Sequence, residues 1–450
     1  MDREAMVTVD SFVVVGAGLP GIVSALTLAG KGHQCVLLEA APDIGGLLRS
    51  YEVDGETFDF GTHFANLTGI DELDRLLFGG REDAWVEYPV LLAGNFWNGQ
   101  LNEVSENPDL NSVSQAIHYR CLAELLSAPG WHGSSNPENA QEFLISEYGQ
   151  NLVDVFFNPV LQKFTGKTSD ALFHNANLLF NLKRFAVLDV PTTDELKRST
   201  KFDSRIAFHH RKDFKFHKPC LYPKSGGIGR WIETLESKLT MAGVDVRTNA
   251  HIESVGIVDK NINELVVDGQ AIGVKGLLWS AAPATFCRLA GEDIGGVKPE
   301  FRSTILVGLV FDRKFSTNCH YITVFDPDFH SFRITLYNNF RLIETDLFSA
   351  TVEFLVSPEK IDSLDWVSVA VDEMIKMGLC NSDAIVKKHH IKTILNGFPV
   401  QSNQSIKNLD EQVKKVKAFK NVHLIGRAGG EGWFLDGLIR QAYETASIIG

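Results

Sequence analysis

The chain has 450 residues, of which 44% are hydrophobic and 22% are charged. This length predicts two or three domains, and the apolar fraction is typical of globular proteins with a packed core. The formal net charge of −13 disfavours nucleic acid or an anionic membrane surface as the main partner, because both are negatively charged. A local basic pocket is still compatible with this overall charge.

The six cysteines are scattered and form no CxxC pair, so neither a disulfide framework nor a structural zinc site is expected. The pairs His209-His210 and His389-His390 have no acidic partners at metal-ligand spacing, so we expect no metal site. The N-terminus lacks a basic segment, and no apolar run is long enough to span a bilayer. These features predict a soluble, cytoplasmic protein in a reducing compartment.

A dinucleotide-binding βαβ unit is predicted near the N-terminus. Residues 12–15 are a short apolar run that suits a strand buried on both faces. A glycine-rich turn follows at 16–21, a helix is predicted at 22–29, and a second apolar strand at 35–38 ends in Glu39. Strand, glycine turn, helix, strand and acid in this order are a more specific signal than the glycine turn alone.

The residues of this unit have distinct physical roles. Gly16 permits a tight turn, Gly18 lets a pyrophosphate approach the backbone because it has no Cβ, and Gly21 allows close packing of helix and strand. The helix N-terminus presents free N–H groups and a partial positive charge to the phosphates. Glu39 is placed to accept hydrogen bonds from both ribose hydroxyls.

Two further glycine segments extend this motif. One is Gly45-Gly46, and the other is the sequence Phe-Asp-Phe-Gly-Thr-His at 58–63. In this respect the chain resembles the flavoprotein superfamily of amine oxidases, protoporphyrinogen oxidases, phytoene desaturases and UDP-galactopyranose mutases. The resemblance implies FAD, with Gly45-Gly46 passing along the cofactor and Gly61-Thr62 beside the isoalloxazine ring. It also implies an active-site role for His63, for which a structural hydrogen bond is the alternative.

The resemblance assigns further cofactor contacts to later segments. The backbone near Ile252 is expected beside adenine, and Ala282 beside the diphosphate. A last strand is predicted at 421–427, followed by a helix at 438–449 whose N-terminus would face the flavin pyrimidine oxygens. Asp436 is expected to cap this helix. The implied flavin contacts in this region are Gly426, Asp436, Gly437 and Leu438.

Two stretches are candidates for substrate binding. Residues 156–166 resemble the segment that crosses under the substrate in UDP-galactopyranose mutases. Phe164 stands one place before the position of the tryptophan that stacks on uracil there, so it is either a substitute or a core residue. Residues 193–218 are basic and aromatic, and Arg205 and then Arg211 best match the mutase arginine that binds the substrate diphosphate. A solvated charged strand is the alternative.

The C-terminal sequence is mutase-like in form, with a strand, Gly-Arg, an aromatic-Leu-Asp segment and a helix. The resemblance makes Arg427 a ligand of a substrate phosphate and, with His63, the expected catalytic residue. Trp433 and Phe434 stand where mutases have a tyrosine, so a phosphate-binding hydroxyl is missing. Arg333 lies among the predicted strands of the substrate sheet and completes the candidate substrate-binding set.

The predicted fold is α/β, with a Rossmann-type FAD-binding domain and an inserted α+β substrate domain that contains an antiparallel sheet. Short alternating apolar runs between 304 and 356 predict that sheet, and the residues after 400 are expected to form a linker. The FAD-binding domain is assigned to residues 8–100, 218–300 and 396–450, and the substrate domain to residues 101–217 and 301–395.

The expected function is that of an FAD-dependent oxidoreductase acting on a small anionic substrate through flavin N5. One alternative is a UDP-galactopyranose mutase-like isomerase that uses reduced FAD on a nucleotide-sugar with no net redox change. A second alternative is a flavin-binding assembly partner without turnover. The expected partner is a small molecule, and the sequence does not define the oligomeric state.

Overall fold

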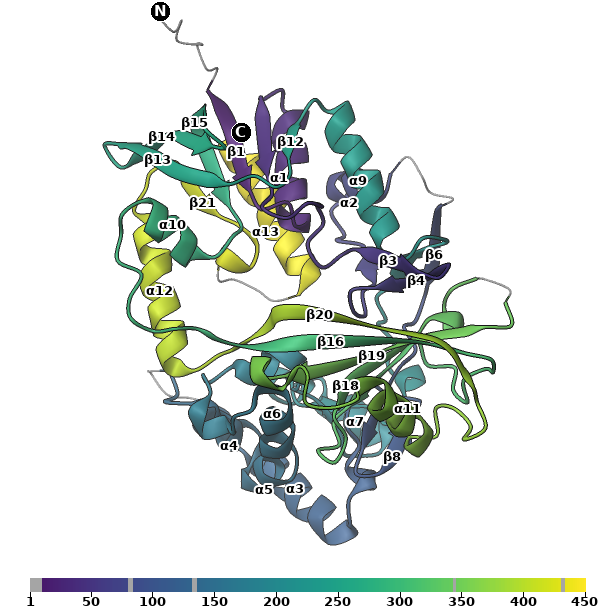
Figure 1. Ribbon diagram of the computed structural model, residues 1–450. Helices are drawn as coiled ribbons and strands as arrows, with labels where there is room; N and C mark the ends of the chain where they lie inside the picture. The colour runs from purple at the N-terminus through teal and green to yellow at the C-terminus, as the bar shows by residue number, and fades with distance from the viewer. Residues whose placement is uncertain (1–9, 80–83, 132–135, 343–344, 430–433) are drawn as a thin grey trace, which may run out of the picture.

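The computed structural model describes residues 10–79, 84–131, 136–342, 345–429 and 434–450. A Rossmann-like layer of strands and helices lies above a second sheet, and a group of helices lies below that sheet (Figure 1). The predicted α/β fold, with a Rossmann-type domain and an antiparallel sheet, is confirmed.

The Rossmann-like sheet is built on β1 (Ser11–Val15), whose five residues are all buried. It pairs in parallel with β2 (Cys35–Leu38) on one side and with β15 (Gln270–Trp279) on the other. The parallel sheet continues with β12 (Asp245–Arg247) next to β2 and β21 (Val422–Leu424) next to β15. Because parallel strands end at the same edge, the turn after β1 meets the ends of its neighbours there. An antiparallel extension adds β14 (Asn261–Val267) and β13 (Ile252–Val258).

Helices cover both faces of this sheet (Figure 1). On one face, α1 (Leu19–Gly30) packs with α13 (Leu435–Ile449) and α9 (Gly229–Met241) in one apolar core. The opposite face packs on α10 (Pro283–Leu289) and α12 (Asn403–Lys417) in a second core. The sheet is thus buried on both sides, as its continuous apolar strands predicted.

The α12 helix occupies residues that were expected to be a linker. It begins with a capping box, in which Ser402 and Ser405 each bond the other's backbone N–H. Gln412 and Val416 are its buried residues, so its apolar stripe is narrow and its composition is mainly polar. The linker prediction was wrong for this reason.

The second sheet contains, in spatial order, β20 (Val386–Val400), β16 (Glu300–Phe311), β19 (Phe348–Val356), β18 (Ser331–Leu336), β17 (Tyr321–Val324), β7 (Ala93–Trp97) and β8 (Gln100–Asn102). Neighbouring strands are antiparallel apart from β17 and β7, which are parallel. One face packs on α11 (Trp366–Lys376). Val310 of β16 lies on the other face and joins the core of the Rossmann-like layer, so this second face is turned toward the predicted cofactor.

The strands β7 and β8 lie in the second sheet, although the predicted FAD-binding segment extends to residue 100. All five residues of β7 are buried, and the strand pairs with β17. A tight turn at Asn98-Gly99, with φ values of 50° and 71°, joins β7 to β8. The chain therefore leaves the Rossmann-like layer before residue 93, because the apolar β7 is buried by pairing with β17.

A helical layer lies below the second sheet (Figure 1). The helical stretch over residues 140–157 is interrupted at Gly149, which has φ of +87°, and residues 153–157 form a π turn. Phe156 in this turn is buried and packs edge-on against Phe325, which follows β17. The helices of this layer are α3 (Gln115–Ser127), α4 (Ala140–Tyr148), α5 (Gln150–Leu152), α6 (Asn158–Thr165), α7 (Val190–Leu196) and α8 (Thr200–Asp203).

Short elements connect the layers. The hairpin of β3 (Ser50–Val53) and β4 (Glu56–Asp59) brings the Tyr51 hydroxyl to 2.8 Å from Nε2 of His390 on β20. No helix within the described ranges is long and apolar enough to cross a membrane. The remaining short elements are β5 (Ala65–Asn66), α2 (Asp71–Phe78), β6 (Trp85–Tyr88), β9 (Phe185–Ala186), β10 (Ile206–Ala207) and β11 (Cys220–Pro223).

Candidate active site

The glycine turn after β1 is shaped as a cradle. Gly16 has φ of +94°, and a Cβ there would lie 2.2 Å from Ser280 Oγ. A Cβ on Gly21 would lie 1.9 Å from the Gly16 carbonyl oxygen, so α1 packs directly on the turn. A Cβ on Gly18, in contrast, would meet nothing nearer than Pro20 Cδ at 3.9 Å. Gly18 thus borders open space at the N-terminus of α1, where backbone N–H groups favour a phosphate.

Glu39 follows β2, with its carboxylate beside this turn. Oε2 accepts a hydrogen bond from Ala17 N at 2.7 Å, and Oε1 accepts one from Ala41 N at 2.9 Å. These bonds hold the carboxylate in place, while each oxygen keeps a further lone pair for another donor. The arrangement fits a pair of ribose hydroxyls.

The Gly45-Gly46 pair lies directly against the glycine turn. Gly45 N donates to the Ala17 carbonyl oxygen at 2.7 Å. A Cβ on Gly46 would lie 3.6 Å from Gly18 Cα, so the two glycine backbones face each other. The positive φ of +99° at Gly45 and its contact with Ile232 of α9 leave no room for a side chain. The turn at 16–21 and the Gly45-Gly46 pair thereby form opposite walls of one cradle.

Three other predicted contacts lie around this cradle. A Cβ on Gly426, which has φ of +63°, would lie 3.2 Å from Pro20 Cγ, so the turn after β21 touches the start of α1. Ala282 is the N-cap residue of α10, and its carbonyl oxygen accepts a hydrogen bond from Trp279 Nε1 at 3.3 Å. Ile252 begins β13, close to Ala250, whose N–H bonds to the backbone oxygen of Glu39. Together, the glycines and Glu39 fit a dinucleotide cofactor.

The start of α13 differs from the prediction. The helix begins at Leu435 with Phe434 as its N-cap residue, so Asp436 lies within the first turn. The prediction that Asp436 is the cap was wrong, because helix geometry begins before it. Its carboxylate accepts a hydrogen bond from Gly437 N at 2.9 Å, and Leu438 is buried in the core. The predicted Trp433 lies outside the described residues.

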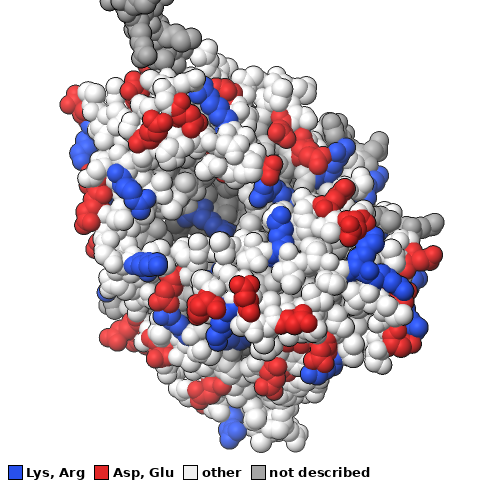
Figure 2. Space-filling model, in the orientation of Figure 1, with Lys and Arg blue, Asp and Glu red and all other residues white. Residues whose placement is uncertain are grey.

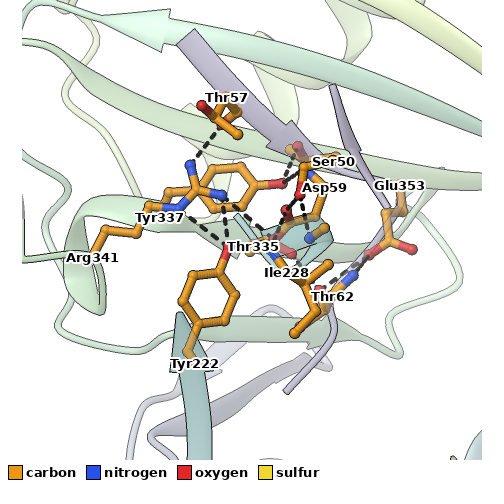
Figure 3. A network of polar contacts seen from close by, with 12 residues as sticks. Ser50, Thr57, Asp59, Thr62, Tyr222, Ile228, Thr335, Tyr337, Arg341 and Glu353 are labelled. Atoms are coloured by element: carbon orange, nitrogen blue, oxygen red, sulfur yellow. Dashed lines mark hydrogen bonds and ion pairs between the residues drawn. The ribbon is translucent and has the colours of Figure 1, made fainter. Parts of the chain in front are cut away.

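The Gly61–His63 segment rests on polar side chains of the second sheet (Figure 3). Thr62 N donates to Glu353 Oε1 at 3.2 Å, and the Thr62 hydroxyl contacts both Thr335 and Glu353. A Cβ on Gly61, which has φ of +107°, would lie 3.3 Å from Glu353 Oε2 and 3.6 Å from Arg333 Nη2. The strands β18 and β19 therefore position the segment that is expected beside the isoalloxazine ring.

Charge around this segment is set by a buried ion pair. Glu353 is 2% exposed, and Arg333 donates to it from Nε at 2.8 Å and from Nη2 at 2.9 Å. Burial opposes the positive charge of Arg333, but Glu353, together with Tyr321 and Tyr337, more than offsets this and raises the pKa of the guanidinium. Burial and then Arg333 lower the pKa of His63 to about 4. His63 is therefore neutral near pH 7 and can only offer hydrogen bonds.

Asp59, at the end of β4, is a second anchor for the same segment (Figure 3). Its buried carboxylate accepts hydrogen bonds from the Tyr222 hydroxyl at 2.5 Å, Ser50 Oγ at 2.6 Å and Ile228 N at 3.0 Å. Arg341 Nη2 lies 3.4 Å from it. Since Ile228 directly precedes α9, Asp59 joins the hairpin, β11 and α9 just before the chain reaches Gly61.

A basic cavity of about 400 Å³ is lined by residues of the predicted basic segment, the end of the helical layer and the loops around β7. Its basic lining residues are Lys183, Arg184, Lys197, Arg211 and Lys218. Of the described residues that line it, Glu106 alone is acidic. Its lining therefore carries more basic than acidic side chains, which makes it a candidate site for an anion.

The candidate substrate residues separate into two groups. Arg211 lines the basic cavity, where it donates to the carbonyl oxygens of Ala93 and Glu103. Arg205 is 4% exposed and forms an ion pair with Glu147 at 2.8 Å inside the helical layer. Phe164 is 1% exposed and packs among other phenylalanines, so it is a core residue, the second of the two roles considered for it. Neither Arg205 nor Phe164 lines the cavity.

Two further candidate residues, Arg427 and Phe434, lie near the C-terminus. Arg427 is in the short turn after β21, and burial lowers the pKa of its guanidinium. Phe434 is 50% exposed, and its ring lies 5.9 Å from Nζ of Lys183, a residue of the basic cavity. Lys218 of the same cavity lies 3.8 Å from Asp436. The basic cavity is therefore adjacent to the N-terminus of α13.

Three residues of the candidate site were missed from the sequence. Glu353 is an isolated carboxylate within an apolar strand, and this is a signal because buried acids need partners. Asp59 stands in the motif at 58–63 but was given no role of its own. Lys183 lies before the basic segment, in a loop that has no recognisable pattern.

The surface is hollowed between the Rossmann-like layer and β20, with Lys and Arg side chains around the opening (Figure 2). A second cavity of about 540 Å³ lies along the Gly45-Gly46 segment and includes Ile44, Arg49, Phe60 and Lys392 in its lining. Space is therefore present on both sides of the segments assigned to the cofactor.

Comparison with known proteins supports this arrangement. Residues 14–77 match the family described as NAD(P)-binding Rossmann-like domain. A 4,4'-diapophytoene desaturase of Staphylococcus haemolyticus is 31% identical over 108 residues, which are 23% of this chain and 21% of the desaturase. An L-amino-acid oxidase of Demansia vestigiata is 27% identical over 186 residues, 37% of this chain and 31% of the oxidase. The chain thus matches between a fifth and a third of the length of these relatives.

Solved structures resemble the chain over nearly its whole length. Reduced UDP-galactopyranose mutase has a TM-score of 0.74 at 15% identity, covering 98% of this chain and 94% of the mutase. Putrescine oxidase bound to putrescine has a TM-score of 0.59 at 12% identity, covering 98% of both chains. The fold and the glycine cradle define a dinucleotide-binding Rossmann-like protein with an inserted sheet domain. Its fold is similar to the folds of UDP-galactopyranose mutase and putrescine oxidase, and parts of its sequence are similar to a desaturase and an L-amino-acid oxidase, so the resemblance predicted from the sequence is confirmed.

Proposed function

We propose that this protein is an FAD-dependent oxidoreductase that acts on a small anionic substrate. The observation that carries the proposal is the combination of three features in one molecule. These are the glycine cradle around Gly18, the Gly61–His63 segment held on Glu353, and the basic cavity beside α13. A cofactor in the cradle that extends past Gly61 would end next to that cavity.

When bound, the flavin supplies a hydride acceptor at N5. The residues of this chain contribute binding and position. Gly18 and the N-terminus of α1 receive the pyrophosphate, and Glu39 receives the ribose. The neutral imidazole of His63 offers a hydrogen bond beside the ring without adding a charge. Arg211 and its basic neighbours hold the anionic group of the substrate.

A mutase-like isomerase is the alternative reaction class, and its support is the similarity of fold to UDP-galactopyranose mutase. The burial of Phe164 in the core argues against this alternative, because that residue is not available to stack on a base. A flavin-binding assembly partner without turnover is the second alternative. All six cysteines are free and buried, and on this basis we propose a reducing, cytoplasmic compartment.

The test begins with the cofactor. Purified protein is denatured, and the released flavin is identified as FAD by chromatography. The FAD-loaded protein is then mixed anaerobically with a panel of small carboxylates and phosphates while the flavin absorbance is recorded. Bleaching of the oxidised flavin supports the oxidoreductase. Ring isomerisation of UDP-galactose by the dithionite-reduced protein, without loss of reductant, would establish the mutase alternative instead. Reducible flavin with no turnover in either assay would favour the assembly partner.

A further inference from the structure

We propose that the substrate is an amphiphilic anion, with its charged group in the basic cavity and its apolar chain along three exposed phenylalanines. These residues, Phe214, Phe216 and Phe434, are called the phenylalanine rim below. The inference rests on the proposed function and names the chemical class of its substrate. It concerns side chains that were not assigned to the cofactor.

Two cations of the head-group site, Arg211 and Lys183, contact neutral groups. Of the other three, Lys197 and Arg184 pair with Asp203, and Lys218 lies near Asp436. Arg211 donates to the backbone oxygens of Ala93 and Glu103. The ammonium group of Lys183 lies over the ring of Phe434. Burial and the charge of Arg184 lower the pKa of Lys183, and Glu106 opposes this effect. An anion bound here would compensate the charges of Arg211 and Lys183 together.

The phenylalanine rim lies at the same cavity. Phe214 and Phe216 line it, with ring centroids 6.3 Å apart, and they are 37% and 80% exposed. Phe434 is 50% exposed and contacts Lys183, which also lines the cavity. Single exposed apolar residues are normal on a protein surface. Here two exposed rings line the basic cavity and a third packs against one of its lysines, which suits an apolar group.

Lysines alternate with these rings. Lys212, Lys215 and Lys218 are exposed beside Phe214 and Phe216, in a chain whose net charge is −13. Lys218 also reaches toward Asp436 in the first turn of α13. An anionic head with an attached alkyl chain is complementary to both properties of this surface. A small hydrophilic anion would use the cations and leave the rings exposed.

The test measures binding to the FAD-loaded protein by titration calorimetry, with a series of probes below their micelle concentrations. The probes are inorganic phosphate and butyl, hexyl, octyl and decyl phosphate. A methylene that becomes fully buried contributes about fourfold in affinity, so partial burial on the rim should give roughly twofold to fourfold per methylene. We expect affinity to rise along the series until the chain extends beyond the rim.

Three variants assign the effect to particular side chains. Phe216→Ala should reduce the gain per methylene and leave the affinity for inorganic phosphate unchanged. Lys183→Gln should weaken binding of every probe, including inorganic phosphate, by about tenfold. Leu395→Ala is the matched control, because Leu395 is 66% exposed but lies on β20. This control should bind the whole series as wild type does.

Other outcomes overturn the inference. Affinity that is independent of chain length, or a Phe216→Ala protein with an unchanged gain per methylene, would show that the rim does not receive an alkyl chain. Binding to vesicles of anionic phospholipid without binding to the monomeric alkyl phosphates would assign the rim to a lipid surface. Flavin content is measured in the same samples. Protein without FAD contradicts the proposed function, whereas FAD-loaded protein without chain-length dependence contradicts this inference alone.

Discussion

Arg333 and Glu353 lie opposite each other on β18 and β19 and form two parallel hydrogen bonds, from Nε at 2.8 Å and from Nη2 at 2.9 Å. The same carboxylate accepts a hydrogen bond from Thr62 N. One ion pair on the second sheet thereby positions a backbone segment that belongs to the Rossmann-like layer. The contact fixes the position of the Gly61–His63 segment relative to the second sheet.

Removing the charge of Glu353 should therefore lower stability. In Glu353→Gln the guanidinium of Arg333 loses its counter-charge in a site where the acid is 2% exposed. We expect a loss of roughly 3 kcal/mol, near the lower end for buried pairs because the Arg333 side chain is 23% exposed. Urea unfolding measures this loss. Asp383→Asn, which breaks an exposed pair with Arg313, should cost less than about 1 kcal/mol. Equal losses in the two proteins would contradict a special role for Glu353.

Gly18→Val should abolish flavin loading and leave the fold intact. A Cβ at Gly18 meets only Pro20 at 3.9 Å, and the φ of −67° suits any residue. The added side chain would occupy the space assigned to the pyrophosphate. The measurements are flavin absorbance per protein and the circular dichroism spectrum. Gly30→Ala is the control, since its Cβ would meet nothing within 4 Å. A Gly18→Val protein that carries a full complement of flavin would refute the cradle assignment.

Two arginines of the basic segment should behave differently. Arg205→Ala leaves Glu147 without its partner in a buried site, so it should lower the free energy of unfolding by roughly 3 kcal/mol. Its affinity for inorganic phosphate should be unchanged. Arg211→Ala should instead weaken phosphate binding by about tenfold, because it removes a cation from the cavity. Urea unfolding and calorimetry separate the two effects. Loss of phosphate affinity in Arg205→Ala would show that Arg205 contributes to the substrate site.

Stability should fall in acid because of buried neutral histidines. Burial and then Arg211 lower the pKa of His320 from 6.5 to about 4. Between pH 6.5 and 4, His320 is protonated in the unfolded chain but neutral in the native state. The free energy of unfolding therefore decreases as the pH falls from 6.5 to 4. His320 alone accounts for at most ~3 kcal/mol of this loss. Urea unfolding at pH 7.0 and 4.5 measures it. His320→Phe should show a smaller difference between the two pH values, and an unchanged difference would exclude His320 as a source.

The sequence by itself determined the local elements of the cofactor cradle. Neighbouring residues determine the glycine turn and the position of Glu39, because a βαβ unit is short. Gly16, Gly18 and Gly21 each stand where a side chain would clash locally or block a ligand. The antiparallel strands were also predictable, since alternating apolar residues mark one buried face. The polar helix α12 was not predictable in this way, because its apolar stripe is narrow and is recognised only once its packing against the Rossmann-like sheet is known.

Tertiary structure decided which of the charged residues could meet a substrate. Arg205 and Arg211 stand in one basic segment and carry the same charge, yet one is neutralised by Glu147 and the other lines a cavity. Glu353 and Thr62 are far apart in the chain and meet only when the second sheet packs under the Gly61 segment. Which charged residues pair with one another depends on long-range packing, because a buried charge is stable only beside a partner. No local pattern in the sequence encodes that partner.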